Sequence, residues 1–407
     1  LVQAEVEGDA DGVRLLAVAA DGEDEVAREL GSPGAHAMRL RIQRPRPWSP
    51  EAPHLYDLRL GLVHEEQVLD RVESYFGLRK VSAEGRTILL NDRPYYQRLV
   101  LDQGYWPDGQ YTAASDADLR ADILWGRRLG FNGARKHQKV EDPRWLYWAD
   151  RLGYLVWGEM PSCGLYHYSR EAMANVRREW REVLARDYNH PCIVTWVPFN
   201  ESWGIWGVRD RPDVQEGVVD VVNMTRATDP TRLVVDNSGW EHVDTDIADV
   251  HSYLRTGEQL RVWWPCYRDG QTYVYDHNHP FWAEGLRFEG QPVLFSEYGG
   301  MAIEGCPPPP DKPLQACGLD SIEEYLRRYH DLTRSILDMP DVCGFCFTQL
   351  ADVEGEVNGL LFYDRRPKVD PELIASYNRE APASYPMPEG VTELACTREV
   401  GPESPHR

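Results

Sequence analysis

The chain has 407 residues, more than one compact domain usually holds, which favours two domains. Hydrophobic residues make up 42% and charged residues 27%, so the chain can build a sizeable core and is neither disordered nor fibrous. The formal charge of −22 opposes binding to nucleic-acid phosphates or anionic lipid surfaces, and no apolar run approaches the roughly 20 residues that span a bilayer. We therefore predict a soluble, globular protein with neither nucleic acid nor a membrane as a partner.

Residues 1–80 contain short alternating runs such as LYDLRLGLV, separated by Gly, Pro and acidic turns, and this pattern predicts a small β-rich module. The first residues begin almost inside a strand, with neither a methionine nor a basic stretch followed by an apolar one. We interpret this start as a sign that the chain is a piece of a longer protein. The compartment is therefore left open, because on this interpretation the start is not the native N-terminus, and the cytoplasm is favoured over the alternatives.

From residue 81 the pattern changes to short apolar strands that alternate with amphipathic helices, as in parallel α/β domains. Side chains at Ser115, Asp142 and Ser169 mark three helix starts, and two more helices are expected at about 213–227 and 320–338. Eight strands are predicted, at 96–101, 131–135, 154–160, 192–201, 232–239, 247–253, 292–299 and 342–350. Eight strands with interleaved helices fit a (β/α)8 barrel over residues 81–385 better than an open sheet, and residues 386–407 look like a polar tail.

Two features of the composition are less specific. Fourteen Trp and 21 Tyr against 9 Phe favour rings that carry a polar group, as sugar-binding clefts use, but filling of a large core accounts for the Trp residues equally well. The eight cysteines are scattered, so a disulfide scaffold is not expected. Cys343 and Cys346 have C-x-x-C spacing inside the apolar run VCGFCF, and we interpret them as buried strand thiols rather than as a metal or redox site.

Two of the predicted barrel strands end in carboxylates. Asn200 and Glu201 follow the apolar run IVTWVPF, and Glu297 follows PVLF. Side chains at the carboxyl ends of barrel strands converge on one face, where active sites form. Burial raises the pKa of a carboxyl group, while cations and hydrogen-bond donors lower it, so such a pair can supply an acid and a nucleophile at neutral pH. Retaining glycoside hydrolysis needs this pair at a separation of about 5–5.5 Å.

The alternative is that each glutamate only pairs with an arginine or caps the next helix, which is the better interpretation of a single strand-end Glu. Two such glutamates, flanked by Asn200, aromatic residues and paired glycines, favour the catalytic interpretation; the flanking residues are Trp203, Trp206, Tyr298, Gly299 and Gly300.

At these residues the chain resembles glycoside hydrolase family 2, the family of β-galactosidases, β-glucuronidases and β-mannosidases. The resemblance covers nearly the whole chain and runs through WSPEAPHLYDL (48–58), FGLRK (76–80), GFNGAR (130–135), ADRLGYLVWGEMP (149–161), NHPCIVTWVPFNESWG (189–204), FSEYGG (295–300) and FYDRRPK (362–368). It implies an immunoglobulin-like β-sandwich, possibly incomplete, over residues 1–80 and a catalytic TIM barrel over residues 81–385. The sugar-binding jelly-roll domain that usually precedes this sandwich is absent from the sequence.

The resemblance also implies roles for individual residues. Glu201 would be the general acid/base and Glu297 the nucleophile, while Asn200 would contact the sugar 2-hydroxyl. Tyr253 falls where the family places a tyrosine that hydrogen-bonds to the nucleophile. Arg135 matches an arginine that helps to keep the nucleophile ionised, because a nearby cation favours a charged carboxylate.

Several positions depart from the family pattern. Where many members have Arg-x-x-His-Tyr-Pro, this chain reads RKHQKV, which puts Gln138 on the usual histidine and His137 beside it; both could line the pocket or be solvated loop residues. The tryptophan that floors the sugar site in many members is replaced by Thr348 or Gln349. Glucuronidases of the family carry Asn-x-Lys where this chain reads EVNGLL, without a lysine, so glucuronidase activity is disfavoured.

The remaining candidates are weighed by position. Trp203, Trp240 and Gln349 join the predicted substrate-binding residues. Glu159, at the end of the third strand, is expected to support the pocket, while Glu304 lies in a loop rich in Gly and Pro and is expected to be solvated. No His/Asp/Glu cluster has convincing ligand spacing, so neither a catalytic metal nor a cofactor is expected.

The sequence therefore predicts a retaining, exo-acting β-glycosidase whose substrate is a β-galactoside or a related neutral glycoside. The resemblance is also compatible with a homo-oligomer. Two alternatives stay open. One is a carbohydrate-binding barrel that has lost catalysis, against which the presence of Glu201, Glu297 and Asn200 argues. The other is an endo-acting barrel glycanase, which needs an open cleft rather than a closed pocket.

Overall fold

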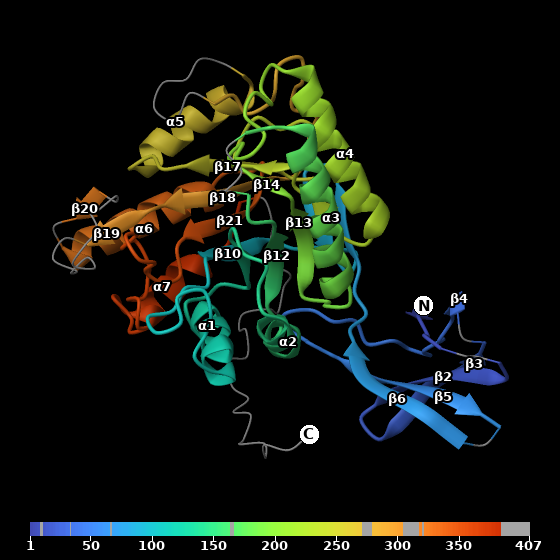
Figure 1. The fold of residues 1–407 in the computed structure, drawn as a ribbon. Coiled ribbons are helices and arrows are strands. Elements are labelled where there is room, and N and C mark those ends of the chain that lie inside the picture. The colour runs from blue at the N-terminus through green and yellow to red at the C-terminus, as the bar shows by residue number, and fades with distance from the viewer. Residues whose placement is uncertain are drawn as a thin grey trace.

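The computed structural model describes residues 1–8, 11–32, 34–65, 67–162, 167–270, 279–303, 317–319 and 321–383, without the side chains of residues 34–37, 317 and 318. A small β-module lies beside a larger α/β body (Figure 1). The predicted polar tail and Glu304 fall outside the described residues. Among the helices of the described ranges, none combines the length and the apolar character that crossing a membrane requires.

The N-terminal module is an antiparallel sheet with a short two-stranded ribbon. The sheet has the strand order β3-β2-β5-β6, and β1 pairs with β4. Leu15 and Ala17, two positions apart on β2, point to the same face and form a small core with Met38 of the ribbon. This arrangement agrees with the incomplete immunoglobulin-like sandwich predicted from the sequence. Its strands are β1 (Val2–Ala4), β2 (Val13–Asp21), β3 (Asp24–Gly31), β4 (Gly34–Met38), β5 (Tyr56–His64) and β6 (Gln67–Phe76).

A short three-stranded sheet follows the module, made of β7 (Val81–Glu84), β8 (Thr87–Leu90) and β9 (Arg93–Pro94). The module itself is joined to the α/β body through buried polar contacts. The indole N–H of Trp48 donates to the carbonyl of Asp150 over 2.8 Å, and the Tyr75 hydroxyl donates to the carboxylate of the same Asp150 over 2.8 Å. Arg79 donates to the carbonyls of Pro191 and Ile193.

The larger body is a (β/α)8 barrel, as the sequence predicts. Its parallel strands are β10 (Gln97–Asp102), β11 (Gly133–Lys136), β12 (Leu155–Glu159), β13 (Ile193–Val197), β15 (Leu233–Val234), β17 (Ala248–Ser252), β18 (Val293–Gly299) and β21 (Val342–Thr348). Their order in the sheet, β15-β13-β12-β11-β10-β21-β18-β17, is the cyclic order of a barrel opened between β15 and β17.

Short extensions close this gap. The strand β14 (Phe199–Asn200) continues β13 and pairs in parallel with β16 (Asn237–Ser238), which continues β15. Beyond β16, the N–H of His251 on β17 donates to the carbonyl of Gly239 over 3.4 Å. The two ends of the eight-stranded sheet therefore meet at the carboxyl side of the barrel. A further parallel pair, β19 (Met301–Ile303) and β20 (Cys317–Leu319), follows β18.

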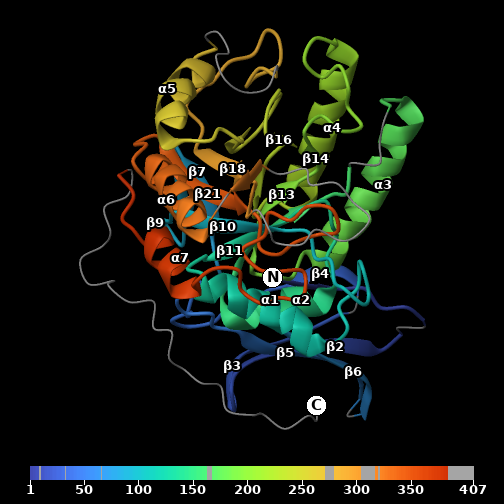
Figure 2. The same ribbon diagram turned by 90° about the vertical axis from the view of Figure 1, so that its left-hand side faces the viewer.

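Seven helices are present in the described ranges, and they lie outside the strands (Figure 2): α1 (Asp116–Arg128), α2 (Pro143–Leu152), α3 (Arg170–Asp187), α4 (Pro212–Thr228), α5 (Gly257–Arg268), α6 (Ile322–Leu337) and α7 (Pro371–Asn378). The expected caps are in place, because the side chains of Ser115, Asp142 and Ser169 each accept a hydrogen bond from the first turn of their helix. The helices α5 and α7 are not anticipated from the sequence pattern.

One continuous apolar core packs the barrel strands against the surrounding helices. Cys343 and Cys346 on β21 are both fully buried and carry free thiols, and the Cys343 thiol donates to the carbonyl of Val293. This placement agrees with their interpretation as buried strand thiols.

Candidate active site

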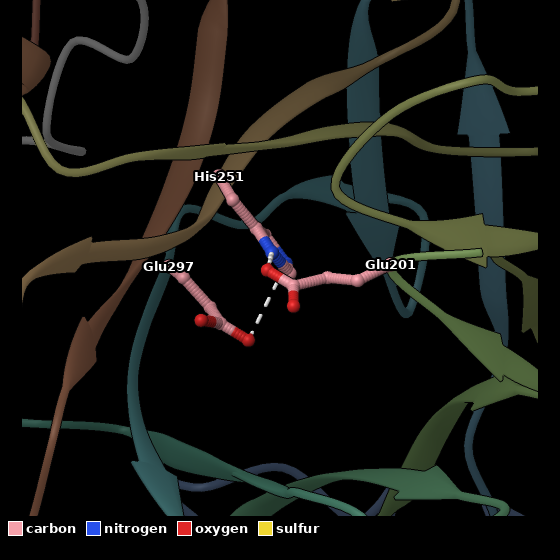
Figure 3. Close-up of side chains that lie close together, drawn as sticks. All are labelled: Glu201, His251 and Glu297. Carbon is pink, nitrogen blue, oxygen red and sulfur yellow. Dashed lines mark hydrogen bonds and ion pairs between the residues drawn. The ribbon is translucent and has the colours of Figure 1, made fainter. Parts of the chain in front are cut away.

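The two strand-end glutamates meet at the carboxyl side of the barrel. Glu201 directly follows β14, and Glu297 lies on β18. His251 on β17 stands between them, because the strand register pairs His251 with Glu297. One carboxylate oxygen of each glutamate and one ring nitrogen of His251 all lie within 4.8 Å of one another (Figure 3).

The backbone presents Glu201 through a strained turn. Glu201 and Ser202 have φ angles of 50° and 60°, in the left-handed region that costs a non-glycine residue free energy. Hydrogen bonds fix this conformation: the N–H of Glu201 donates to the carbonyl of Ser238 over 3.0 Å, and the N–H of Ser202 donates to the side chain of Asn237 over 2.9 Å. The Glu201 side chain remains 26% exposed, so it can meet both a ligand and water.

Glu297 is more enclosed, with 5% of its surface exposed. The guanidinium of Arg135 donates to Oε1 of Glu297 over 3.0 Å, and the hydroxyl of Tyr253 donates to Oε2. Both oxygens of Glu297 thus accept hydrogen bonds, which suits a carboxylate, because an ionised carboxylate has acceptors and no donor.

Arg135 connects the strand ends. It is fully buried on β11 and, besides Glu297, donates to Glu159 over 2.6 Å and to the side-chain oxygen of Asn200 over 2.6 Å. Burial by itself would raise the pKa of Glu159, but the charges of Arg135 and His137 outweigh it and lower this pKa to about 2. Glu159 is therefore the ionised counter-charge that Arg135 needs inside the barrel, in line with its expected supporting role.

His137 and Gln138 lie on the same loop but face different neighbours. His137 lines the pocket, and its Nδ1 is 2.9 Å from Glu159 and 3.9 Å from Glu297. Burial lowers the pKa of His137, but the charge of Glu159 overcomes this and raises the pKa above its usual value. Gln138 instead has a φ of 53° and accepts a hydrogen bond from the N–H of Ser162 over 2.7 Å, so it braces the loop behind the pocket.

His251 is the central residue that the sequence analysis did not find. Its Nδ1 is 2.8 Å from Oε1 of Glu201, and its Nε2 is 3.1 Å from a donor nitrogen of Arg135. Because Arg135 can only donate, we assign the ring proton to Nδ1, which then donates to Glu201. Burial is the main cause that lowers the pKa of His251, to about 4, so the ring is neutral near pH 7. The alternation of side chains along a strand places His251 and Tyr253 on one face, a signal that the sequence does contain.

The other predicted aromatic residues lie around the site rather than in it. The ring of Trp240 stacks on His279 at 4.5 Å and meets His251 edge-on at 5.6 Å. Trp203 forms an edge-to-face pair with Trp206, with ring centroids 5.3 Å apart, and Trp206 is 41% exposed. Among the described residues that line the pocket, neither Trp203 nor Trp240 occurs.

A pocket of about 430 Å³ opens beside the two glutamates. Glu201, Glu297, Tyr253 and His137 line it, whereas Arg135, Asn200, Gln138 and Gln349 are not among the residues that line it. Further lining residues, which the sequence analysis did not count among the site residues, are Gln103, Arg255, Arg328, Glu356 and Asn358. Gln349 is fully buried and donates to Glu356 over 2.9 Å and to Asn358 over 2.7 Å.

Glu201, His251 and Glu297 are also the side chains, among those the structure describes, whose ligand atoms are close enough to share a cation. The Arg135 guanidinium already lies 3.0 Å from Glu297 and 3.1 Å from His251. Because that fixed positive charge would repel a second one, the geometry suits a hydrogen-bonded acid–base pair better than a metal centre.

Two family models match the chain. The model "Glycosyl hydrolases family 2, TIM barrel domain" matches residues 81–378, and the model "Glycosyl hydrolases family 2" matches residues 5–79. The chain belongs to glycosyl hydrolase family 2. This membership agrees with the resemblance found in the sequence, including its N-terminal module.

Similar proteins are known from bacteria. A β-galactosidase of Pectobacterium atrosepticum is 31% identical over 175 residues, which cover 41% of this chain and 17% of that protein. A β-galactosidase of Aeromonas hydrophila is 26% identical over 416 residues, covering 91% of this chain and 36% of that protein. The chain thus spans about a third or less of these relatives. The solved β-D-glucuronidase of Dictyoglomus thermophilum has a TM-score of 0.71 at 21% identity, covers 92% of this chain and 65% of that chain, and shows the shared fold.

Proposed function

We propose that this chain is a retaining, exo-acting β-glycosidase, with Glu297 as nucleophile and Glu201 as general acid/base. The observation that carries the proposal is the separation of the two carboxylates, whose nearest oxygens lie within 4.8 Å. Retaining glycosidases hold their carboxyl groups about 5–5.5 Å apart, whereas inverting enzymes need about 6.5–9.5 Å to admit a water molecule between them and the sugar. The short separation therefore favours double displacement.

The surroundings of the glutamates support this division of roles. Glu297 accepts hydrogen bonds from Arg135 and Tyr253 and is nearly enclosed, as suits an ionised nucleophile. Glu201 is more exposed and contacts the neutral ring of His251. The Nδ1–H of this ring can donate to Oε1 of Glu201 whether Glu201 is ionised or protonated. The proton that Glu201 transfers is then carried by Oε2, because Oε1 accepts from the imidazole.

In the first step, Glu297 attacks the anomeric carbon and forms an ester bond while the glycosidic C–O bond breaks. The leaving oxygen takes the proton from Glu201. In the second step, the Glu201 carboxylate removes a proton from water, the water oxygen bonds to the anomeric carbon, and Glu297 leaves as a carboxylate. Two inversions return the original anomeric configuration.

Asn200 supports the transition state in this scheme. Its side-chain oxygen accepts from Arg135, so the amide NH₂ is the group that it can offer to the sugar 2-hydroxyl. A hydrogen bond to that hydroxyl strengthens as positive charge develops on the sugar ring. For Trp203, Trp240 and Gln349 we propose a smaller role: they border the sugar site and determine its shape.

The proposed substrates are β-galactosides or related neutral glycosides, and the bounded pocket favours removal of a terminal sugar over attack inside a chain. The names of the relatives include both β-galactosidase and β-glucuronidase, so the sugar is decided by experiment.

The test is a panel of aryl β-glycosides carrying galactose, glucose, mannose, glucuronate, fucose or arabinose, with Glu297→Ala beside the wild type. We expect hydrolysis of a neutral glycoside by the wild type and a loss of at least about 10³-fold in Glu297→Ala. Hydrolysis that survives in the variant contradicts the assignment of the nucleophile. If sugars bind but none of the panel is cleaved, the carbohydrate-binding alternative is favoured.

A further inference from the structure

The turn that presents Glu201 is held by a buried carboxylate that the proposed reaction does not use. Ser202 is the second residue of this turn, and its buried hydroxyl donates to Oε2 of Glu241 over 2.5 Å. Glu241 is also buried and lies in the loop between β16 and β17. Because an enclosed carboxylate is costly unless donors surround it, the partners of Glu241 show what it does in the fold.

Asn237 on β16 fixes the direction of the Ser202 hydroxyl. The side-chain oxygen of Asn237 accepts from the N–H of Ser202 over 2.9 Å, and its NH₂ group donates to the carbonyl of Trp240 over 2.7 Å and to Oγ of Ser202 over 3.1 Å. The Ser202 oxygen thus already accepts a hydrogen bond, and its single proton goes to Glu241. The hydroxyl is therefore a fixed link between the turn and the carboxylate.

The other oxygen of Glu241 faces His279. Nδ1 of His279 lies 3.0 Å from Oε1 of Glu241, and because a carboxylate can only accept, we assign a proton to this nitrogen. The N–H of Glu241 donates to the carbonyl of Pro280 over 2.9 Å, so the backbone ties Glu241 to the same segment. Glu241 has a φ of 52°, a conformation that persists only where such contacts enforce it. Glu241 is thus anchored on both sides.

The network also reaches the carboxyl end of Glu201. The ring of His279 stacks on Trp240, with an angle of 12° between the ring planes, and Trp240 meets His251 edge-on. His251 in turn lies 2.8 Å from Oε1 of Glu201. Contacts that start at Glu241 therefore close a circuit around Glu201, through the backbone turn on one side and through the imidazole on the other.

The two glutamates of the pocket are held in different ways. Glu297 is fixed through its own carboxylate by Arg135 and Tyr253. Glu201 extends from two successive residues with positive φ, so the position of its carboxyl group depends on how firmly this turn is held. Proton transfer needs the two heavy atoms within about 2.6–3.2 Å, and a displacement of about 1 Å can cost about 100-fold in rate.

We propose that Glu241 is a positioning residue for the general acid/base: acting through Ser202, it holds the turn that directs Glu201 at the leaving oxygen. Glu241 does not occur among the described residues that line the pocket, so it acts on the reaction through Glu201 and not on the sugar. The inference rests on the proposed function, because the role exists only if Glu201 transfers protons.

The test uses phenyl, 4-nitrophenyl and 2,4-dinitrophenyl glycosides of one sugar that the wild type cleaves. A dinitrophenolate leaves without a proton, whereas the phenol oxygen must be protonated as it leaves. Glu241→Ala should therefore lower kcat/KM by about 10–100-fold for the phenyl glycoside and by less than about threefold for the dinitrophenyl glycoside. The ratio of the two values in one variant does not depend on the folded fraction, so lost structure cannot imitate this result.

Two further variants examine the link itself. Glu241→Gln should keep most of the rate, because the amide oxygen can accept from Ser202 while the NH₂ group meets Nδ1 of His279. Ser202→Ala should reproduce the leaving-group dependence of Glu241→Ala. The double variant should fall no further than either single variant, because the two residues act in series.

Glu380→Ala is the matched control. It also removes a glutamate paired with a histidine, since Oε1 of Glu380 lies 2.7 Å from Nε2 of His330. Arg98, near the amino end of β10, donates to the carbonyl of Glu380 over 3.3 Å, which places this pair at the opposite end of the barrel from the pocket. The control should leave the ratio of the phenyl to the dinitrophenyl glycoside unchanged.

The outcomes separate this inference from the proposed function. Hydrolysis that depends on Glu297, with equal losses on all three glycosides in Glu241→Ala or with no loss, overturns the positioning role and leaves the function standing. Losses of Glu241→Ala and Ser202→Ala that multiply in the double variant also overturn it. If the wild type cleaves none of the aryl glycosides, the proposed function fails, and the positioning role fails with it.

Discussion

At the scale of single residues, the site is built from one buried cation and the groups it orients. Arg135 donates to Glu159, Asn200 and Glu297, and its contact with Nε2 of His251 leaves Nδ1 to donate to Glu201. One guanidinium therefore positions both Glu297, the proposed nucleophile, and, through His251, Glu201, the proposed general acid/base. The planar guanidinium of arginine can bind several acceptors at once through its N–H groups, whereas the ammonium group of a lysine would offer a single point charge.

Glu201→Ala removes the proposed acid/base and should separate the two steps of the proposed reaction. Glycosides with poor leaving groups should lose about 10²–10⁴-fold in rate, because their oxygen must be protonated to leave. A dinitrophenyl glycoside should still form the intermediate, and added azide should restore turnover by attacking it without general-base help. Rate measurements with and without azide check this. An equal loss on good and poor leaving groups, with no rescue, would contradict the role of Glu201.

His251 makes stability depend on pH in a way that can be isolated. Its pKa is about 4 in the folded chain, against about 6.5 when unfolded, so its contribution is present above pH 6.5 and is lost as pH falls towards 4. Between pH 7 and pH 5 this loss amounts to about 2 kcal/mol. His251→Asn keeps a donor near Glu201 and does not titrate. Urea unfolding at both pH values should show a drop that is larger in the wild type by about this amount; equal drops would refute the buried, neutral histidine.

At the scale of elements, the site depends on how the barrel closes. The closure between β16 and β17 brings Gly239 next to His251, where Gly239 has a φ of 108° and a Cβ would lie 2.7 Å from the imidazole. Only glycine meets both conditions, because it tolerates positive φ and has no side chain. The same closure supports Glu201, whose N–H donates to the carbonyl of Ser238.

Gly239→Ala should therefore disturb the site and the fold together. Strain at the positive φ alone costs about 1–3 kcal/mol, and the added methyl must also push the ring of His251 away from Glu201. Urea unfolding and initial rates would measure the two effects. Gly290→Ala is the control, because Gly290 also has a positive φ, of 96°, but open space at its Cβ position. If Gly239→Ala lowers stability no more than the control and leaves activity intact, the close approach of Gly239 to His251 contributes neither to the fold nor to the site.

Much of this architecture is predictable from local patterns, and the exceptions have physical causes. All eight barrel strands were predicted, because each is a short apolar run between turns and helix caps. The helix α5 was missed although Thr256 and Gln259 form a capping box at its start, since Pro265 and adjacent tryptophans obscure its periodicity. The helix α7 was missed as well, although it begins with an Asp N-cap followed by Pro, the same signal that marks the start of α2.

The site was predictable where it depends on strand ends and not where it depends on register. Glu201 and Glu297 follow apolar runs directly. The contact of His251 with Glu297 depends on the pairing of β17 with β18, which shifts register between Val250 and His251. The bonds of Glu241 need the turn after β14, the loop after β16 and His279 to meet, and no single stretch of sequence encodes that meeting.

At the scale of the whole molecule, the N-terminal module is attached far from the chemistry. Trp48 is fully buried and donates to Asp150 near the end of α2, before β12 begins, whereas the site lies at the other end of the barrel strands. Asp150 also accepts from Tyr75 and from the N–H of Cys192, so one residue of the barrel holds two segments of the module. The junction should therefore stabilise the chain without entering the reaction.

Trp48→Ala should lower the free energy of unfolding by about 3–5 kcal/mol, because it removes a large, fully buried side chain. The rate per folded molecule should stay within about twofold of the wild type, since no contact of Trp48 reaches the pocket. Val68→Ala, at a side chain that is 64% exposed on the module, is the control and should change stability by less than about 0.5 kcal/mol. A selective loss of rate in a folded Trp48→Ala would show that the module acts on the site.

The central claim is that Glu297 forms a covalent bond to the sugar. The most direct measurement is to incubate the chain with a 2-deoxy-2-fluoro β-glycoside that carries a dinitrophenyl leaving group, and to locate the label by mass spectrometry of the digested protein. The fluorine slows release of the intermediate, so one sugar should be found per chain, on the peptide that contains Glu297. A label on Glu201 or on any other residue, or hydrolysis that inverts the anomeric centre without a label, would contradict the account.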